Sequence, residues 1–296
     1  MRRSVIRCLS FSVVAVGLSL SLLQPVWAET QPKKKQTQTT KPAAAAPAAI
    51  PDQAAPDQAE QGGAQQNGER IDNAIQYKHC VALARQKPEE GWEESLAWGS
   101  LGGGEAAKHC GTVALIGLKH YEEAATRLET LAKDSKGAAK LRAGMLAQAG
   151  QAWLLAKRPE QAYAAQSAAL QLVPDAPDLL IDRAESLADA KNYKDAKADL
   201  DKSIAIDPNR VEAYVFRAAA KRYLDDLPGA AQDCAAAIKL DPNYQDAWLE
   251  SGMVKRLQGD NAGARKDWAK VLELAPNSNA ADDARRNIEI LDVKTQ

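Results

Sequence analysis

Apolar, small and polar positions recur in the second half of the chain with a fixed spacing of 34 residues. Residues 177–244 contain the pattern twice, so that Ala196 corresponds to Ala230 and Pro208 to Pro242. The same frame extends in both directions without a slip, and it gives four units that begin at Ala143, Pro177, Val211 and Gln245. A repeat of this length predicts an array of equivalent structural units.

The composition favours helices as the content of these units. Hydrophobic residues make up 45% of the chain, but alanine dominates them, and aromatic residues make up only 5%. Such a mixture suits helices that approach closely through small side chains better than a sheet core of branched and aromatic residues. The net charge of −1 provides no global field for nucleic acid, and the recognition motifs of nucleic-acid-binding proteins are absent.

The 34-residue unit resembles the tetratricopeptide repeat (TPR), a helix–turn–helix module, over roughly residues 105–278. The resemblance implies that the two helices of a unit cross at two small positions, because a larger side chain there would push them apart. The first of these positions is Thr112, Gly150, Ala184, Ala218 and Gly252, and the second is Ala124, Ala162, Ala196, Ala230 and Ala264. Proline closes four of the units, at Pro174, Pro208, Pro242 and Pro276, where it ends the second helix.

The resemblance therefore implies an all-α fold: a right-handed TPR α-solenoid of about five helical hairpins, preceded by a degenerate hairpin and followed by a capping helix. We expect the degenerate hairpin at residues 70–104, with its second helix beginning at Pro88. The repeats are expected at 105–138, 143–176, 177–210, 211–244 and 245–278. The last repeat leaves an apolar face open, so 279–296 is expected to form the capping helix and tail, with Ile288, Ile290 and Leu291 on one side.

A partner-binding groove follows from the same resemblance, since positions 2, 5, 9 and 12 of TPR units tend to project onto the concave face. By this correspondence the groove contains Asp178, Ile181, Glu185, Glu212, Val215, Arg222, Asp246, Leu249, Met253 and Arg256, and Tyr223 lies beside them. The lysine/asparagine clamp with which chaperone-binding TPRs hold a C-terminal carboxylate is absent. What remains is an apolar stripe flanked by acids, which suits a peptide with apolar anchors and some basic residues. The alternatives are that this face is only solvated, or that the chain's own N-terminal arm covers it.

Charged residues also repeat inside the array. Arg183 and Arg217 occupy a position that is usually apolar in the family, and Asp199 and Asp233 recur further along each unit. We expect the two arginines to form ion pairs with Asp199 or Asp233, in a structural and not a catalytic role.

The N-terminus has the features of a secretory signal. A basic start at Arg2 and Arg3 precedes an apolar core over residues 11–23, and Val26-Trp27-Ala28 supplies the small residues that a signal peptidase requires. We expect residues 1–28 to be a signal peptide cleaved after Ala28, which predicts a periplasmic protein. A retained membrane anchor is disfavoured because Gln24-Pro25 interrupts the apolar run well short of about 20 residues. Twin-arginine export is a further alternative.

Residues 29–69 form a low-complexity segment rich in Ala, Pro and Gln. Almost no large apolar residue is present, so the segment cannot bury enough area to offset its ordering entropy, and we expect a disordered arm. Attraction of Lys33, Lys34 and Lys35 to an anionic envelope surface is an alternative role for it.

Two of the cysteines lie in a repeated tripeptide, Lys78-His79-Cys80 and Lys108-His109-Cys110. Because an exported protein meets an oxidising compartment, a Cys80–Cys110 disulfide is the favoured interpretation. Separate thiols and a zinc site remain open, although neighbouring residues on a helix diverge and do not converge on one metal. Cys234 is expected to be a buried core residue.

The function that these observations favour is a non-enzymatic scaffold or adaptor that binds protein segments in the periplasm through a concave TPR groove. A periplasmic holdase-type chaperone is the alternative, and a thiol- or metal-dependent enzyme that uses the His/Cys pairs is a third class. We expect no catalytic residues, no cofactor, no metal, no nucleic-acid partner and no stable membrane insertion after signal cleavage.

Overall fold

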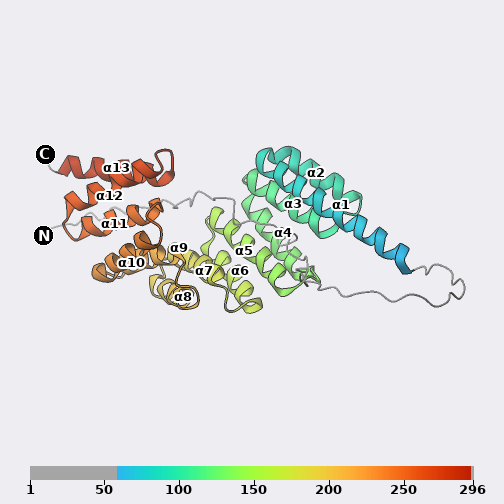
Figure 1. Ribbon diagram of the computed structural model, residues 1–296, viewed down its shortest axis with the longest axis horizontal. Coiled ribbons are helices and arrows are strands. Elements are labelled where there is room, and N and C mark those ends of the chain that lie inside the picture. The colour runs from blue at the N-terminus through green and yellow to red at the C-terminus, as the bar shows by residue number, and fades with distance from the viewer. Residues whose placement is uncertain (1–58, 295–296) are drawn as a thin grey trace, which may run out of the picture. The chain divides into compact units, whose positions relative to one another are not determined.

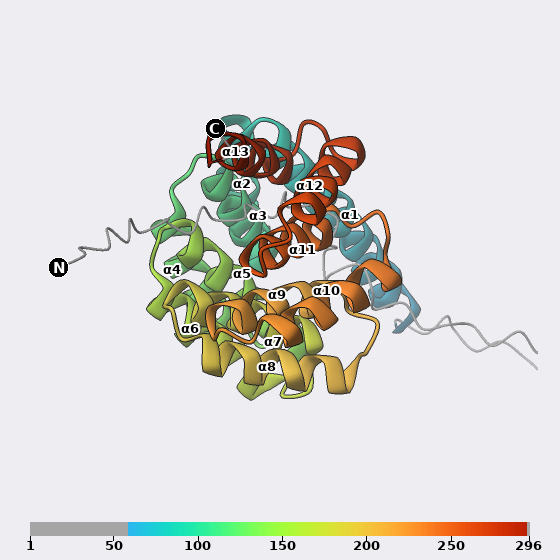
Figure 2. The same cartoon turned by 90° about the vertical axis from the view of Figure 1, so that its left-hand side faces the viewer.

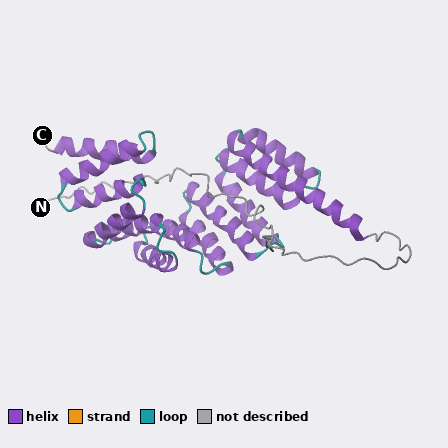
Figure 3. Cartoon of the chain, viewed as in Figure 1, coloured by secondary structure: helices purple, strands orange, loops and turns teal. Residues whose placement is uncertain are grey.

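The structure is a computed structural model that describes residues 59–294 and gives side-chain surroundings for residues 73–292. The elements in this part are all helices (Figures 1 and 3): α1 (Ala59–Gln86), α2 (Pro88–Ser100), α3 (Gly104–Gly117), α4 (Tyr121–Asp134), α5 (Ala139–Leu155), α6 (Pro159–Leu172), α7 (Pro177–Asp189), α8 (Tyr193–Ile206), α9 (Val211–Tyr223), α10 (Leu227–Leu240), α11 (Gln245–Leu257), α12 (Asn261–Leu274) and α13 (Asn279–Lys294). The chain divides after Leu118. We describe the N-terminal unit (α1–α3) and the repeat unit (α4–α13) separately.

In the N-terminal unit three helices pack around one apolar cluster. Cys80 and Cys110 are fully buried in it, and a disulfide joins them with their Cα atoms 6.0 Å apart. The helices approach closely at glycines: a Cβ at Gly111 would lie 2.9 Å from the Ser95 hydroxyl oxygen, and one at Gly117 would lie 2.6 Å from the Pro88 ring. Both small residues let α3 lie against the α1–α2 pair.

This unit differs from the sequence-based expectation at both of its boundaries. α1 begins at Ala59, inside the segment expected to be disordered. The Ala, Glu and Gln residues of 59–66 favour a helix, Gly62 and Gly63 disfavour it, and a helix already nucleated by packing extends cooperatively into the segment. At the other end, the expected repeat 105–138 is divided: α3 belongs to the N-terminal unit and α4 to the repeat unit.

The repeat unit is built from antiparallel helix pairs in two layers (Figure 2). α5, α7, α9 and α11 are the first helices of successive repeats, and each contacts the next. α6, α8, α10 and α12 pack beside them as the second layer. The expected all-α TPR fold, with hairpins in sequence order and a terminal helix, is confirmed, and each hairpin forms because its two apolar faces can be buried only against each other and the neighbouring pair.

Helix crossings in the repeat unit match a small residue on the first helix with a larger one on the second. A Cβ at Gly252 would lie 2.3 Å from Trp268 Nε1, and one at Gly150 would lie 2.6 Å from Gln166 Cγ. Ala218 meets Cys234, which is a buried free thiol as expected. The size of the residue on the second helix therefore determines how small its partner must be.

Ion pairs link the two helices of a repeat at the same spacing. Arg183 donates to Asp199 through two nitrogens, both at 2.7 Å, and Arg217 donates to Asp233 at 2.9 and 2.7 Å. In the next repeat Ser251 takes the place of the arginine and donates to Asp267 at 2.6 Å. The predicted structural ion pairs are thus confirmed.

Short turns fix the angle between paired helices. The residue before the N-cap of the second helix has a left-handed backbone in each repeat, with φ of 60° at Lys157, 63° at Lys191, 62° at Asp225 and 88° at Gly259. The side chain of Asp226 then accepts a hydrogen bond from the backbone N–H of Gly229, and Asn192 and Asp260 act in the same way.

α13 closes the array by packing on α11 and α12. Ala284, Ile288 and Leu291 pack on the apolar cluster that α13 shares with α11 and α12. Ile290 is exposed, so the expectation that it lies on the same side as Ile288 and Leu291 was wrong. Ser278 precedes the helix and accepts a hydrogen bond from the Ala281 N–H, as an N-cap does.

The expected signal peptide and most of the expected arm lie outside the described residues. Within residues 59–294, no helix combines the length and apolar content needed to cross a membrane.

Candidate functional site

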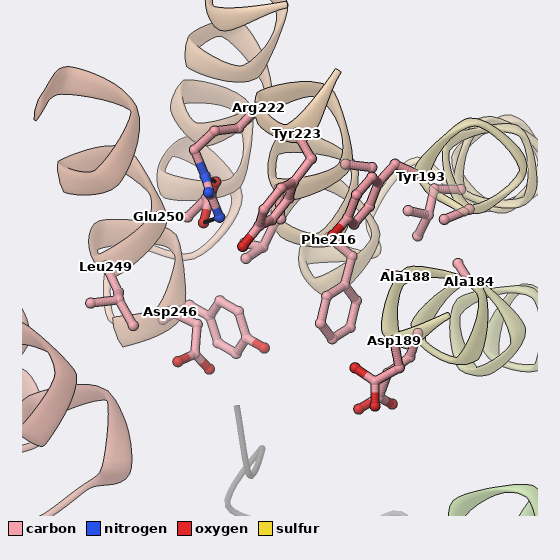
Figure 4. Close-up of a pocket in the computed structure, with 17 residues that line it drawn as sticks. Ala184, Ala188, Asp189, Tyr193, Phe216, Arg222, Tyr223, Asp246, Leu249 and Glu250 are labelled. Carbon is pink, nitrogen blue, oxygen red and sulfur yellow. Dashed lines mark hydrogen bonds and ion pairs between the residues drawn. The ribbon is translucent and has the colours of Figure 1, made fainter. Parts of the chain in front are cut away.

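A cleft opens among the first helices of three successive repeats. It is lined from α7 by Ala184, Glu185, Ala188 and Asp189, from α9 by Val215, Phe216, Ala219, Ala220, Arg222 and Tyr223, and from α11 by Asp246, Leu249 and Glu250. Tyr193, Ala196 and Leu200 of α8 and Tyr244 before α11 complete the lining (Figure 4). Its volume of about 120 Å³ is comparable to the roughly 150 Å³ of a cavity that admits benzene, so one large side chain fits.

Aromatic side chains form a fixed wall of the cleft. The rings of Tyr193 and Tyr223 are stacked at 4.4 Å with an interplanar angle of 8°, although they come from different repeats. The Arg222 guanidinium lies 4.4 Å from the centre of the Tyr223 ring. It also donates two hydrogen bonds, at 2.6 and 3.1 Å, to the Glu250 carboxylate of the next repeat. The resulting stack crosses three repeats and fixes the position of the wall through contacts within the protein.

Three further carboxyl groups lie at the cleft. The pKa of Glu185 is raised to about 8, mainly by burial and also by the nearby charges of Asp182 and Asp189, with Lys157 opposing the shift. Burial also raises the pKa of Asp189 and that of Asp246, the latter opposed by a hydrogen bond from Tyr244. These groups face a mostly apolar surface, in which an ionised carboxylate loses hydration.

The residues predicted for the groove separate into two groups. Glu185, Val215, Arg222, Tyr223, Asp246 and Leu249 line the cleft. The others lie elsewhere. Asp178 pairs with Arg210, and Ile181 is buried in the core. Met253 packs on the apolar cluster that α11, α12 and α13 share. Glu212 and Arg256 do not line the cleft either.

Arg222 has a role that the sequence did not indicate. Its side chain and that of Glu250 are each only 11% exposed, so the pair is part of the array and not a free charge offered to a partner. Glu250 and Phe216 occupy the sixth position of their repeats, which the family correspondence does not place on the concave face. Both nevertheless line the cleft, where Phe216 packs on the apolar cluster of the preceding repeat and Glu250 pairs with Arg222 of the preceding repeat.

The His/Cys tripeptides supply no comparable site. Cys80 and Cys110 are bonded to each other, His79 is exposed, and His109 lies buried with its Nδ1 2.9 Å from the Tyr77 hydroxyl. Within the described part of the chain, no three His, Cys, Asp or Glu side chains cluster in a way that could hold a metal ion.

The repeat length, the paired helices and the two-layer packing define a helical-repeat protein with the TPR fold. No family model matches the chain, and no curated protein matches it. Among solved structures the chain is similar to MamA 41-end from Desulfovibrio magneticus RS-1, with 22% identity and a TM-score of 0.48 over 57% of this chain and 93% of that one. It is also similar to YrrB, described as a TPR protein with an unusual peptide-binding site, with 19% identity and a TM-score of 0.45 over 61% of this chain and 91% of that one. A third similar structure is the first TPR of Spaghetti (RPAP3) bound to the HSP90 peptide SRMEEVD, with 22% identity and a TM-score of 0.40 over 42% of this chain and 99% of that one.

Proposed function

We propose that the repeat unit is a non-enzymatic scaffold that holds a segment of another protein on the face formed by α7, α9 and α11. The observation that carries this proposal is the cleft itself. Its apolar and aromatic lining is held in place by the Tyr193–Tyr223 stack and the Arg222–Glu250 pair. A site that is already ordered avoids much of the entropy cost of binding, and a concave apolar site with a few polar groups is typical of ligand recognition.

Two exposed tyrosines provide a matched test of this function. Tyr223 is 40% exposed and lines the cleft, whereas Tyr163 on α6 is 43% exposed and lies outside it. Each also has an arginine over its ring. Tyr223→Ala and Tyr163→Ala therefore remove the same side chain with a similar neighbour, from different places.

The experiment is in-cell crosslinking of the full-length protein, followed by affinity capture and quantitative mass spectrometry. We expect Tyr223→Ala to lose a small, defined set of partners that wild type and Tyr163→Ala both retain. Equal loss in both variants, or no loss in either, contradicts a binding role for the cleft. Suppressed aggregation of unrelated unfolded proteins, independent of Tyr223, would instead indicate a holdase.

We further propose that the protein works in the periplasm after removal of residues 1–28. The sequence of the N-terminus and the pairing of Cys80 with Cys110 support this location, since disulfides persist in oxidising compartments. Cell fractionation and the intact mass of the purified protein test it. A mature N-terminus at Glu29 in the periplasmic fraction is expected, and a cytoplasmic chain that retains Met1 contradicts it.

A further inference from the structure

The charges at the cleft are unbalanced. Glu185, Asp189, Asp246 and Glu250 contribute four carboxyl groups to the lining, and Arg222 contributes the one cationic group. Glu250 already pairs with Arg222 at 2.6 Å. None of the remaining three acids forms an ion pair with a described residue. A cation from outside the repeat unit could therefore pair with these three acids.

The position of these acids relative to the aromatic rings indicates where a cation would lie. In the view of Figure 4, Phe216 lies between Asp189 and Asp246. The Tyr223 ring is already covered by Tyr193 and Arg222, so Phe216 is the ring that can meet a cation. Ring faces attract ammonium and guanidinium groups, and carboxylates add direct charge pairing. Phe216 and Leu249 offer apolar surface for a methylene chain.

We propose that the cleft binds a lysine or arginine side chain of the partner segment, with its cationic head among Glu185, Asp189 and Asp246 and its aliphatic stem along Phe216 and Leu249. This inference rests on the proposed scaffold function and specifies the chemistry that the scaffold recognises. A segment anchored by a free carboxylate would find no free cation in the cleft lining, because Arg222 already pairs with Glu250.

The state of the acids before binding supports the proposal. Burial raises the pKa values of Glu185 and Asp189, and Lys157 lowers both. The charges of Asp182 and Asp189 on the same helix raise the pKa of Glu185 further. Across the cleft, burial likewise raises the pKa of Asp246. An arriving cation replaces the missing counter-charge, so it favours the ionised carboxylates and releases protons to the buffer.

The probe for the test is N-acetyl-lysine methylamide, and its matched control is N-acetyl-norleucine methylamide, which lacks only the ammonium group. Binding is followed on the full mature protein by shifts of the Tyr and Phe ring signals in NMR spectra. A ligand of this size is expected to bind with a Kd on the order of 1 mM. We expect the lysine derivative to bind at least tenfold more tightly than the control at pH 8.5, and its affinity to fall at least tenfold at pH 6.

Two variants test whether the lysine probe binds in the cleft. Glu185→Gln combined with Asp246→Asn should remove the preference for lysine over norleucine, whereas Tyr163→Ala should leave it intact. The proposal is overturned if the two probes bind with equal affinity. It is also overturned if the ring signals do not shift at a lysine-probe concentration 50-fold above the expected Kd. Binding that appears only after Lys33, Lys34 and Lys35 are changed to Gln assigns the cleft to the chain's own arm and also overturns it. Partners that depend on Tyr223 while the lysine probe fails would leave the scaffold function standing without this inference.

Discussion

Removal of the Asp233 carboxylate tests whether the buried ion pairs stabilise the array. Asp233 accepts hydrogen bonds from Arg217 at 2.9 and 2.7 Å and pairs with Lys221 at 2.8 Å, and its side chain is 5% exposed. Asp233→Ala leaves two cations beside an apolar crossing. Loss of one partner from a buried pair costs roughly 3–5 kcal/mol. Arg217 still pairs with Asp201 at 2.8 Å after the substitution. We therefore expect a loss at the lower end of this range, about 3 kcal/mol in the free energy of unfolding.

The matched control is Glu273→Ala, because Glu273 also pairs with a lysine at 2.8 Å but is 68% exposed. Surface pairs contribute roughly 0–1 kcal/mol. At about 2–4 °C per kcal/mol for a unit of this size, Asp233→Ala should lower Tm by roughly 6–12 °C and Glu273→Ala by less than about 4 °C. Thermal unfolding followed by circular dichroism at 222 nm measures both. A loss for Asp233→Ala no larger than that of the control would refute the reasoning.

Three other predictions concern pH, the disulfide and the turns. The raised pKa of Glu185 means that the folded state binds more protons than the unfolded state between pH 4.5 and about 8. The free energy of unfolding therefore falls as pH rises through this window. Glu185→Gln should reduce that fall, which Tm scans from pH 5 to 8.5 measure. Removal of the Cys80–Cys110 bond, whose cysteines are 30 residues apart, should destabilise the N-terminal unit by roughly 3–4 kcal/mol in urea unfolding, and non-reducing mass spectrometry that finds two free thiols would count against the bond itself. Both Asp225 and Gly259 have a left-handed φ, which glycine adopts without strain. Asp225→Gly should therefore stabilise the repeat unit and Gly259→Ala should destabilise it, each by roughly 1 kcal/mol. Changes of the opposite sign would show that these turns are not strained.

The strict period explains why pairings inside the repeat unit were predictable. A constant separation of 16 residues joins Arg183 to Asp199 and Arg217 to Asp233, and a fixed frame places both partners of such a pair on facing helices. The left-handed turn residues were less visible, since only Gly259 has the residue type that signals this conformation. Lys191 and Asp225 adopt it because the two helices that they join are held by packing.

The N-terminal unit and the cleft were harder to foresee for different reasons. The apolar spacing of α3 suits any helical partner, and the burial of Cys110 with the close approach at Gly111 determines that it packs with α1 and α2. In the cleft, the family correspondence identified Val215 and Asp246 but missed Phe216 and Glu250. Both are placed by contacts with the preceding repeat, and a frame for a single repeat does not contain such contacts.

The most direct measurement of the central claim is site-specific photo-crosslinking in cells, with p-benzoylphenylalanine placed at Tyr223 or at Tyr163. Both positions have similar exposure, but only Tyr223 lines the cleft. If the face formed by α7, α9 and α11 holds a segment of another protein, the probe at Tyr223 should give discrete crosslinked species that the probe at Tyr163 does not give. The same species from both positions, or none from Tyr223, would contradict the account.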